Sequence, residues 1–262
     1  MSRITTVTNQ KGGVGKTTTA HALAAGLARK GYNVLLIDTD GQANLSDTAN
    51  ADPSTPGINE LLEVAINNPA QLPRVIPQTI QHTGIDIIAA SDTLDGIDLT
   101  LADVGANRAY ILKSITEQLA PEYDHIIIDT PPTLGLMTIN ALTASDDIVI
   151  PIKAEIYALR GFAKLENTIS KTKEHYNPAL KVAGLLVTMY NDRTILTRSL
   201  YEDLRKQAAN LNTPMYKTYI RQGIAVGEAQ TLQQNIFEYA PKSKPAADYA
   251  AFVDEYLTQE RI

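Results

Sequence analysis

The stretch NQKGGVGKTTT (9–19) holds the residues of this chain best suited to phosphate chemistry. Its glycines let the backbone curl so that several N–H groups face an anion, and a helix starting near Gly15 adds its positive end. Lys16 would then contact the β- and γ-phosphates of a nucleotide, and the Thr17 hydroxyl would ligate Mg²⁺. A glycine turn that binds nothing is disfavoured because strand, loop, Lys-Thr and helix follow in the right order. We therefore predict a nucleotide site formed by Gly12, Gly13, Val14, Gly15, Lys16, Thr17 and Thr18.

This loop departs from the usual phosphate-binding pattern of Gly, four residues, then Gly-Lys-Ser/Thr. Position 10, where the first glycine would fall, is Gln10, and a second lysine, Lys11, follows it. A loop that already has a phosphate-contacting lysine does not need another for its own nucleotide. A solvated loop residue is the plain reading of Lys11, so the pattern alone leaves its role open.

Three aspartates follow apolar runs of strand length. Asp129 ends the run in HIIIDTPP, and a carboxylate at the tip of a buried parallel strand faces the crevice where such folds bind ligands. Because Mg²⁺ prefers hard oxygen ligands, Asp129 is a predicted metal ligand beside Thr17. In VLLIDTDGQANLS, we expect Asp40 to hold the attacking water near the γ-phosphate, and Asp38 to support the metal shell or a loop lysine. Ordinary turn-forming aspartates are the alternative.

These residues need a parallel sheet to bring them together. A β-branched strand at 3–8, a helix at 16–30 closed by Gly31, and an apolar strand at 34–37 make a βαβ unit. Apolar runs of this kind suit strands that are covered on both faces. The chain is therefore predicted to be an α/β protein with a mostly parallel, twisted sheet and helices on both faces. Further strands are expected at 85–89, 126–128, 148–152 and 182–187, helices at 107–120, 159–176 and 197–211, and loops at 53–56 and 69–77.

Length and composition set the outer limits. The 262 residues suit one domain over 1–262, and 44% hydrophobic residues provide a sizeable core. No cysteine is present, which excludes disulfides and thiolate metal sites. The N-terminus shows no secretory signal, and no run of 18 apolar residues could span a bilayer, so we expect a cytoplasmic protein.

The segments KGGVGKTTT, IDTDGQANLS and IIIDTPPTLGLMTINAL together strongly resemble the nucleotide motifs of the ParA family, the deviant-Walker ATPases of DNA partition. The similarity continues through PIKAEIYALRG, GLLVTMYNDRT and IRQGIAVGEAQ, and so covers nearly the whole chain. The resemblance implies a weak Mg²⁺-dependent ATPase that forms a sandwich homodimer when ATP binds. It also implies that Lys11 reaches across the dimer to the phosphates held by the other copy, that Asp40 orients the water, and that Asp38 and Asp129 belong to the metal shell.

Similarity to ParA further implies non-specific DNA binding by the dimer, association with the nucleoid, and a ParB-type centromere-binding partner that stimulates hydrolysis. The net charge of −6 does not favour DNA, but residues 193–221 carry a local charge of +4. A helix at 197–211 would pack Leu200, Leu204, Ala208 and Leu211 inward and leave its arginines outside. The candidate DNA contacts are Arg193, Arg198, Lys217 and Arg221, and a solvated helix face is the alternative.

Three further expectations follow from comparison with relatives. The adenine base is expected near the end of the strand at 182–187, with Met189, Asn191 and Pro214 as candidates. Membrane attachment is not expected, because DYAAFVDEYLTQERI at the C-terminus has an acidic polar face and an apolar stripe suited to core packing. A metabolic ATP-dependent ligase of the dethiobiotin-synthetase type stays as the alternative function, and the cargo, whether plasmid or chromosome, is left open.

Overall fold

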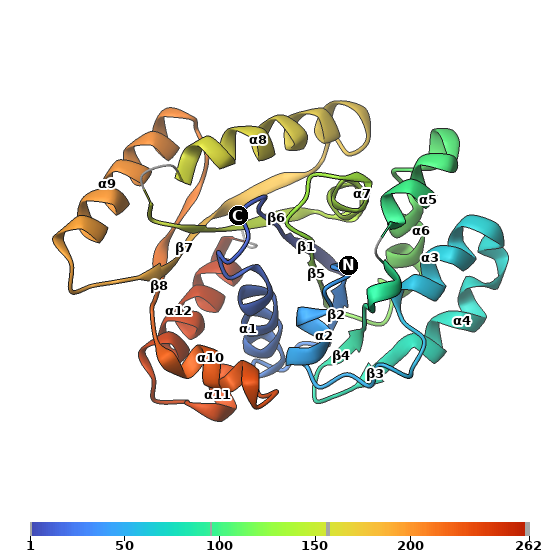
Figure 1. The fold of residues 1–262 in the computed structure, drawn as a ribbon, viewed down its shortest axis with the longest axis horizontal. Coiled ribbons are helices and arrows are strands. Elements are labelled where there is room, and N and C mark those ends of the chain that lie inside the picture. The colour runs from blue at the N-terminus through green and yellow to red at the C-terminus, as the bar shows by residue number, and fades with distance from the viewer. Residues whose placement is uncertain (1, 95, 156–157, 260–262) are drawn as a thin grey trace.

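A single eight-stranded sheet forms the centre of the molecule (Figure 1). The computed structural model describes residues 2–94, 96–155 and 158–259. The strand order is β3-β4-β2-β5-β1-β6-β7-β8, and all pairs are parallel except β3 with β4. The predicted fold class, a mostly parallel sheet in an α/β protein, is confirmed. The strands are β1 (Arg3–Val7), β2 (Val34–Asp38), β3 (Ile80–His82), β4 (Asp86–Ile88), β5 (His125–Asp129), β6 (Asp147–Lys153), β7 (Lys181–Tyr190) and β8 (Met215–Arg221).

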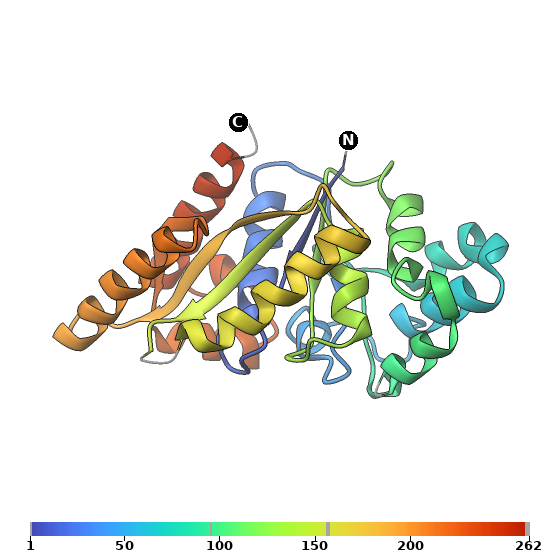
Figure 2. The same cartoon turned by 90° about the horizontal axis from the view of Figure 1, so that it is seen from above.

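Helices cover both faces of this sheet, and Figure 2 shows α8 and α1 on opposite sides of the strands. Three short 3₁₀ turns, at Pro69–Gln71, Asp92–Leu94 and Gly105–Asn107, join some of the elements. The α-helices are α1 (Lys16–Ala28), α2 (Asn44–Thr48), α3 (Ile58–Asn67), α4 (Leu72–Thr79), α5 (Ile97–Asp103), α6 (Ile111–Leu119), α7 (Leu136–Ala144), α8 (Ala158–His175), α9 (Ile195–Asn210), α10 (Ile224–Thr231), α11 (Ile236–Tyr239) and α12 (Lys244–Gln259).

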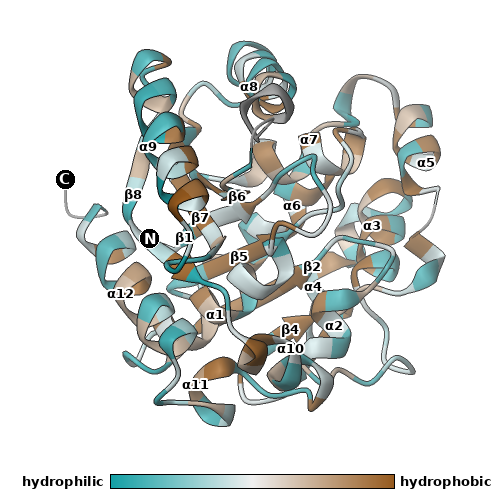
Figure 3. Cartoon of the chain, turned by 60° about the vertical axis from the view of Figure 1, so that its left-hand side comes forward, coloured by the Kyte–Doolittle hydropathy of each residue, from teal (hydrophilic) through white to brown (hydrophobic). Residues whose placement is uncertain are grey.

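Alternate residues of each strand supply cores on the two faces of the sheet. In β2, Leu36 packs with α1 and α12 on one face, whereas Leu35 and Ile37 pack with α3, α6 and α7 on the other. Beyond β1, strands β6 and β7 pack against α8 and α9 in a third cluster. Hydrophobic residues accordingly concentrate on the central strands in Figure 3. Burial on both faces explains why these strands read as continuous apolar runs in the sequence.

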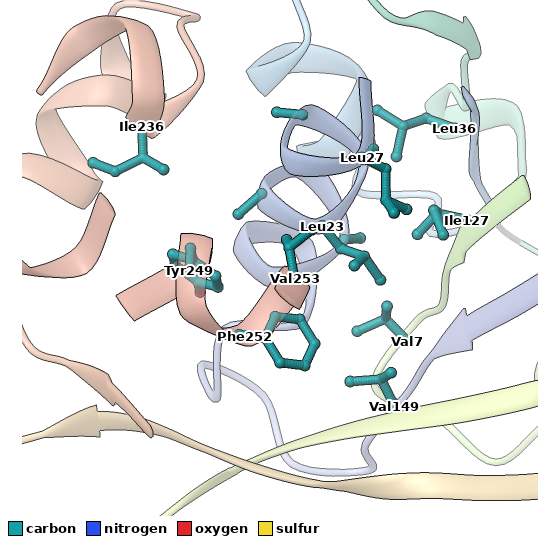
Figure 4. Packing of buried hydrophobic residues seen from close by; sticks show 14 of the residues in the cluster. Val7, Leu23, Leu27, Leu36, Ile127, Val149, Ile236, Tyr249, Phe252 and Val253 are labelled. Carbon is teal, nitrogen blue, oxygen red and sulfur yellow. The ribbon is translucent and has the colours of Figure 1, made fainter. Parts of the chain in front are cut away.

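The first core is centred on the contact between α1 and α12. Leu23 and Leu27 of α1 belong to the same buried cluster as Phe252 and Val253 of α12. In Figure 4, Leu27 points toward Leu36 and Ile127 of the sheet, and α12 packs on another side of α1. With Tyr249 and Tyr256 also buried, the apolar stripe of the C-terminal helix is a packing face. This confirms the role expected for the stripe, while residues 260 and 261 of the same segment lie outside the described part of the chain. No helix among the described residues is long and apolar enough to cross a membrane.

Carboxylates of α12 also bind the backbone of β8, the last strand of the sheet. Glu255 accepts hydrogen bonds from the N–H groups of Lys217 and Thr218, at 2.7 and 2.9 Å, where the pairing of β8 with β7 is irregular. Asp248 accepts one from the N–H of Arg221 at 2.9 Å. The strand and the helix are therefore joined by polar contacts as well as by their apolar side chains.

Segment 69–77 and Leu211 differ from the sequence-based expectations. The segment 69–77, expected to be a loop, forms a 3₁₀ turn and helix α4, which contains Pro77. Buried Leu72 and Ile76 lie on one side of this short helix, so packing outweighs the cost of the proline. Leu211, expected to face inward, lies just beyond the end of α9 and is 45% exposed, whereas Leu204 and Ala208 are buried as expected.

Candidate nucleotide site and basic surface

The glycine-rich loop lies in the middle of the sheet because it follows β1, which pairs with β5 on one side and β6 on the other. Parallel pairing brings the carboxyl ends of these strands to one edge, where the loop meets the residues that follow β2 and β5. Gly13 and Gly15 have φ values of 68° and 83°, in the left-handed region that glycine adopts without strain. The loop borders a hollow of about 770 Å³, which is also lined by Lys16, Thr17, Thr18 and Asp40. The structure therefore brings together these residues, which the sequence predicts to form a phosphate site.

Lys16 and Thr17 stand at the start of α1, with their side chains near the tip of β5. Lys16 is 8% exposed, and burial lowers the pKa of its amine while nearby Asp129 and Asp40 partly oppose that shift. The Thr17 hydroxyl donates a hydrogen bond of 2.7 Å to Oδ2 of Asp129. A buried ammonium beside a helix N-terminus is suited to a polyphosphate, which would replace the water that the lysine has lost.

Asp129 is the best-placed group for a metal ion. Its side chain is almost completely buried, and Oδ1 has no hydrogen-bond partner among the described residues. Burial, followed by the charge of Asp38 on the neighbouring strand, raises the pKa of Asp129 well above its usual range. An unsatisfied buried carboxylate oxygen next to a threonine hydroxyl fits one or two inner-sphere positions of Mg²⁺, which keeps several waters. The donor set is therefore compatible with magnesium.

Asp38 lies beside Asp129 on the neighbouring strand, and its carboxylate binds groups of its own loop. Its Oδ2 accepts hydrogen bonds from the N–H and the hydroxyl of Ser46, at 2.9 and 2.8 Å, and its Oδ1 accepts one from the N–H of Asp40 at 3.1 Å. The carboxylate thus organises the loop between β2 and α2. It supports Asp40, whose own Oδ1 accepts a hydrogen bond from the N–H of Gln42 at 3.1 Å.

Lys11 lies apart from the hollow that its neighbours line. Its ammonium forms an ion pair with Glu155, which follows β6, and its side chain is 49% exposed. Asn9 explains this position: its amide donates to the carbonyl of Pro151 at 2.7 Å, while its Oδ1 accepts from the N–H of Lys11 at 3.0 Å. The loop after β1 is thereby fixed beside the chain that leaves β6.

A second, smaller hollow of about 260 Å³ adjoins the glycine loop through Gly15 and Thr18. Met189 lines it, together with the turn between β8 and α10 and with Gln230, whose amide donates to the Thr18 hydroxyl at 3.0 Å. Asn191 lies outside this lining and accepts a hydrogen bond from the N–H of Arg193. Pro214 precedes β8 at the opposite edge of the sheet, because β8 runs parallel to β7. Of the three residues expected near the base, only Met189 reaches the hollow.

The four candidate DNA contacts differ in how free they are. Arg193 and Lys217 are exposed, and Arg198 is exposed with one bond of 3.2 Å to the carbonyl of Asp192. Arg221 is instead held by Asp248 through contacts of 2.5 to 3.1 Å from Nε and Nη2. Lys217 and Arg221 both belong to β8, whereas the other two lie at and before the start of α9.

Three residues with a clear role in this region could not be recognised from the sequence pattern. Asn9 anchors the loop and Glu155 binds Lys11, although both lie inside segments already singled out. Gln230 reaches the loop from α10, across more than 200 residues of sequence. Contacts of this kind depend on the packing of distant elements, so only the fold could reveal them.

A parallel sheet with a glycine loop at its centre, a lysine and a threonine at the start of the following helix, and an aspartate at the facing strand tip define a P-loop nucleotide-binding protein. A family described as an AAA domain matches residues 2–182. The sporulation initiation inhibitor protein Soj of Bacillus subtilis is 37% identical over 255 residues, which cover 97% of this chain and 98% of Soj. This chain belongs to the Soj/ParA family of chromosome-partitioning proteins, as its motifs indicate.

Two further proteins are similar to this chain over almost its whole length. The chromosome partitioning protein ParA of Myxococcus xanthus is 33% identical over 261 residues, which cover 99% of this chain and 89% of that protein. The solved structure of cobyrinic acid a,c-diamide synthase from Mycobacterium smegmatis with a bound ATP analogue and magnesium is 31% identical. It superimposes with a TM-score of 0.84 over 100% of this chain and 96% of that one.

Proposed function

We propose that this chain is a weak Mg²⁺-dependent ATPase that drives plasmid or chromosome segregation. ATP binding joins two copies into a sandwich homodimer, and the dimer binds DNA non-specifically on the nucleoid. A ParB-type partner at a centromere-like site stimulates hydrolysis and releases the dimer from DNA. Membership in the Soj/ParA family supports this cycle, as does the magnesium-compatible phosphate site.

The position of Lys11 carries the proposal. Gly12, Gly13 and Lys16 line the nucleotide hollow, whereas the Lys11 ammonium is exposed and contacts Glu155. A cation that stands beside a phosphate site without entering it is suited to contact the nucleotide of a second copy, as an arginine finger supplied in trans does. Two facing triphosphates repel each other unless such cations lie between them, so dimerisation becomes dependent on ATP.

The other residues divide the chemistry of hydrolysis between them. Lys16 and the loop N–H groups bind the β- and γ-phosphates, Thr17 and Asp129 hold Mg²⁺, and Asp40 orients the attacking water. When bound, Mg²⁺ neutralises charge that develops on the phosphate oxygens. Asp38 acts on this site through Asp40, because its carboxylate binds the backbone of that residue. The base occupies the hollow that Met189 and Gln230 line.

DNA binding would use the exposed cations near α9 and on β8. Arg193, Arg198 and Lys217 are available for phosphate contacts, which carry no sequence information and weaken with salt. The pairing of Arg221 with Asp248 makes this arginine a weaker candidate than the other three. Because a dimer presents each residue twice, modest binding by one copy becomes tighter binding once ATP joins two copies.

The decisive experiment compares the wild-type chain with Lys11→Ala and Lys16→Ala. With Mg²⁺ and a non-hydrolysable ATP analogue, sedimentation velocity should show a wild-type dimer and a Lys11→Ala monomer that still binds the analogue. Lys16→Ala, which removes the cation of the phosphate site itself, should lose nucleotide binding. A wild-type chain that stays monomeric under these conditions would refute the proposal.

A metabolic ligase is the second candidate, because a structure 31% identical to this chain is that of a cobyrinic acid a,c-diamide synthase. Co-sedimentation with DNA in the presence of ATP, ADP or no nucleotide separates the two functions. Retention with ATP alone supports partition. Absence of retention, together with ATP turnover that depends on a small carboxylic acid, supports the ligase.

A further inference from the structure

Glu155 contacts two lysines at the edge of the sheet that holds the phosphate loop. One is Lys11, and the other is Lys153, whose Nζ lies 2.8 Å from the second oxygen of the same carboxylate. The adjacency of β1 and β6 brings the three residues together, since Lys11 follows β1 whereas Lys153 and Glu155 lie at and after the end of β6. All three side chains are partly exposed, at 49%, 43% and 34% for Lys11, Lys153 and Glu155.

We propose that Glu155 is a latch that holds Lys11 within its own copy until ATP drives dimer formation. This inference depends on the proposed function, since it concerns the lysine that would act across the dimer. A single ammonium cannot remain against Glu155 and also lie among the phosphates of a partner nucleotide. Each copy must therefore break this ion pair before its Lys11 can act in trans.

Lys153 lowers the free-energy cost of releasing Lys11 from Glu155. When Lys11 leaves, the second oxygen of Glu155 keeps its contact with Lys153, so the carboxylate is not left without a cation. The pKa of Glu155 is lowered by its hydrogen bond to Lys11 first and by that to Lys153 second, which indicates that both lysines stabilise the same charge. Glu155 is thus a positioning residue that sets how readily Lys11 becomes available.

The size of the effect follows from the exposure of the pair. Exposed ion pairs change an equilibrium constant by about two- to fivefold. Because two copies must release Lys11 for each dimer formed, the factor enters twice. Loss of the latch should therefore strengthen dimerisation by about four- to twenty-five-fold.

Two variants should change the dissociation constant of the dimer in opposite directions, and a third serves as a control. In Mg²⁺ and a non-hydrolysable ATP analogue, Glu155→Gln should lower the dissociation constant of the dimer by the stated factor. Lys153→Gln should raise it, because Glu155 then has only Lys11 as a partner. Glu174→Gln removes the same charge from an exposed position at the far end of α8 and should leave the constant unchanged.

A measurement on the nucleotide-free monomer tests the contact directly. An ammonium held against a carboxylate is less available to an acylating reagent, so Lys11 should be labelled about two- to fivefold faster in Glu155→Gln than in the wild type. Peptide mass spectrometry gives this rate for Lys11, and Glu174→Gln serves as the control.

The outcomes separate the latch from the proposed function. If the wild type dimerises with the analogue but Glu155→Gln dimerises equally or more weakly, the latch is refuted and the partition function stands. Unchanged labelling of Lys11 in Glu155→Gln refutes the latch as well. If the wild type does not dimerise at all, the proposed function fails, and the latch fails with it.

Discussion

At the scale of single residues, Asp129 combines features that ordinary structural carboxylates avoid. It is buried, one oxygen lacks a hydrogen-bond partner among the described residues, and Asp38 lies beside it on the neighbouring strand. Such an arrangement costs folding free energy unless a cation completes it. The aspartate therefore makes sense as part of a binding site rather than as a stabilising group.

Replacement of Asp129 by Asn tests this role, because the amide keeps the shape and removes the charge. Loss of an outer-shell partner of a metal ligand costs about 10- to 100-fold in metal affinity, so loss of a ligand should cost at least about tenfold. Titration calorimetry with ATP, with and without Mg²⁺, should show that magnesium no longer tightens nucleotide binding. Equal tightening in the variant and the wild type would remove Asp129 from the metal site.

The sequence predicts the positions of single site residues well where a residue follows a recognisable strand or loop. Lys16, Thr17 and Asp129 meet as expected, because parallel strands end at one edge and the pattern reveals those ends. Asp38 was harder to assign, since nothing in its spacing shows that Ser46 would bind its carboxylate. Pro214 was misplaced because strand β8 was not predicted, so its position relative to the sheet was unknown.

At the scale of elements, α1 and α12 approach so closely that Gly26 has no room for a side chain. A Cβ at this position would lie 2.5 Å from Cγ2 of Val253. Helix propensity alone favours alanine over glycine by about 1 kcal/mol, but overpacking costs about 1–3 kcal/mol. We expect Gly26→Ala to lower the free energy of unfolding, measured by urea denaturation. Gly26→Ala with Val253→Ala should lose less than the sum of the two single variants, and strict additivity would contradict the contact.

The ion pair between Arg221 and Asp248 joins β8 to α12, so Arg221 has a structural role. The side chain of Asp248 is only 11% exposed, so removal of its partner leaves a nearly buried charge. We expect Arg221→Ala to destabilise the fold by about 1–3 kcal/mol in urea denaturation. Lys217→Ala, on the same strand but exposed, should leave stability unchanged and weaken only DNA binding. Normal stability of Arg221→Ala would show that the ion pair contributes little.

Helix and strand patterns in the sequence predict many of the elements. They fail where tertiary packing determines the secondary structure. The strands of the sheet centre are long apolar runs and were predicted, as were α1, α6, α8 and α9. Strand β8 was missed although buried Tyr216 and Ile220 lie on one face of it, because a short run between turns with weak alternation is a weak signal. Helix α4 was missed because Pro73 and Pro77 are typical of loops, and only its burial against α6 and α3 favours a helix.

At the scale of the whole molecule, buried titratable groups make stability depend on pH in opposing directions. Burial lowers the pKa of His21 to about 4 from 6.5, so the unfolded chain binds more protons between these values and stability is lost as pH falls. The buried carboxyls Asp38 and Asp129 have raised pKa values, so their contribution has the opposite sign. The overall curve therefore mixes both effects.

A comparison of two chains isolates the histidine. Between pH 7 and pH 5, His21 should cost the wild type about 2 kcal/mol of stability that His21→Gln does not lose. Urea denaturation of both chains at the two pH values gives this difference. If the two chains respond equally to pH, His21 is protonated as readily in the folded state as in the unfolded one.

The carboxylates that α12 places on β8 have a consequence for the behaviour of many copies at once. The last strand of an open sheet offers unpaired backbone groups to any extended segment nearby, which is a common start of aggregation. Here Glu255 and Asp248 already bind three N–H groups of that strand. A foreign strand would have to displace both side chains before it could pair. Pairing of this strand with a second chain is thus discouraged.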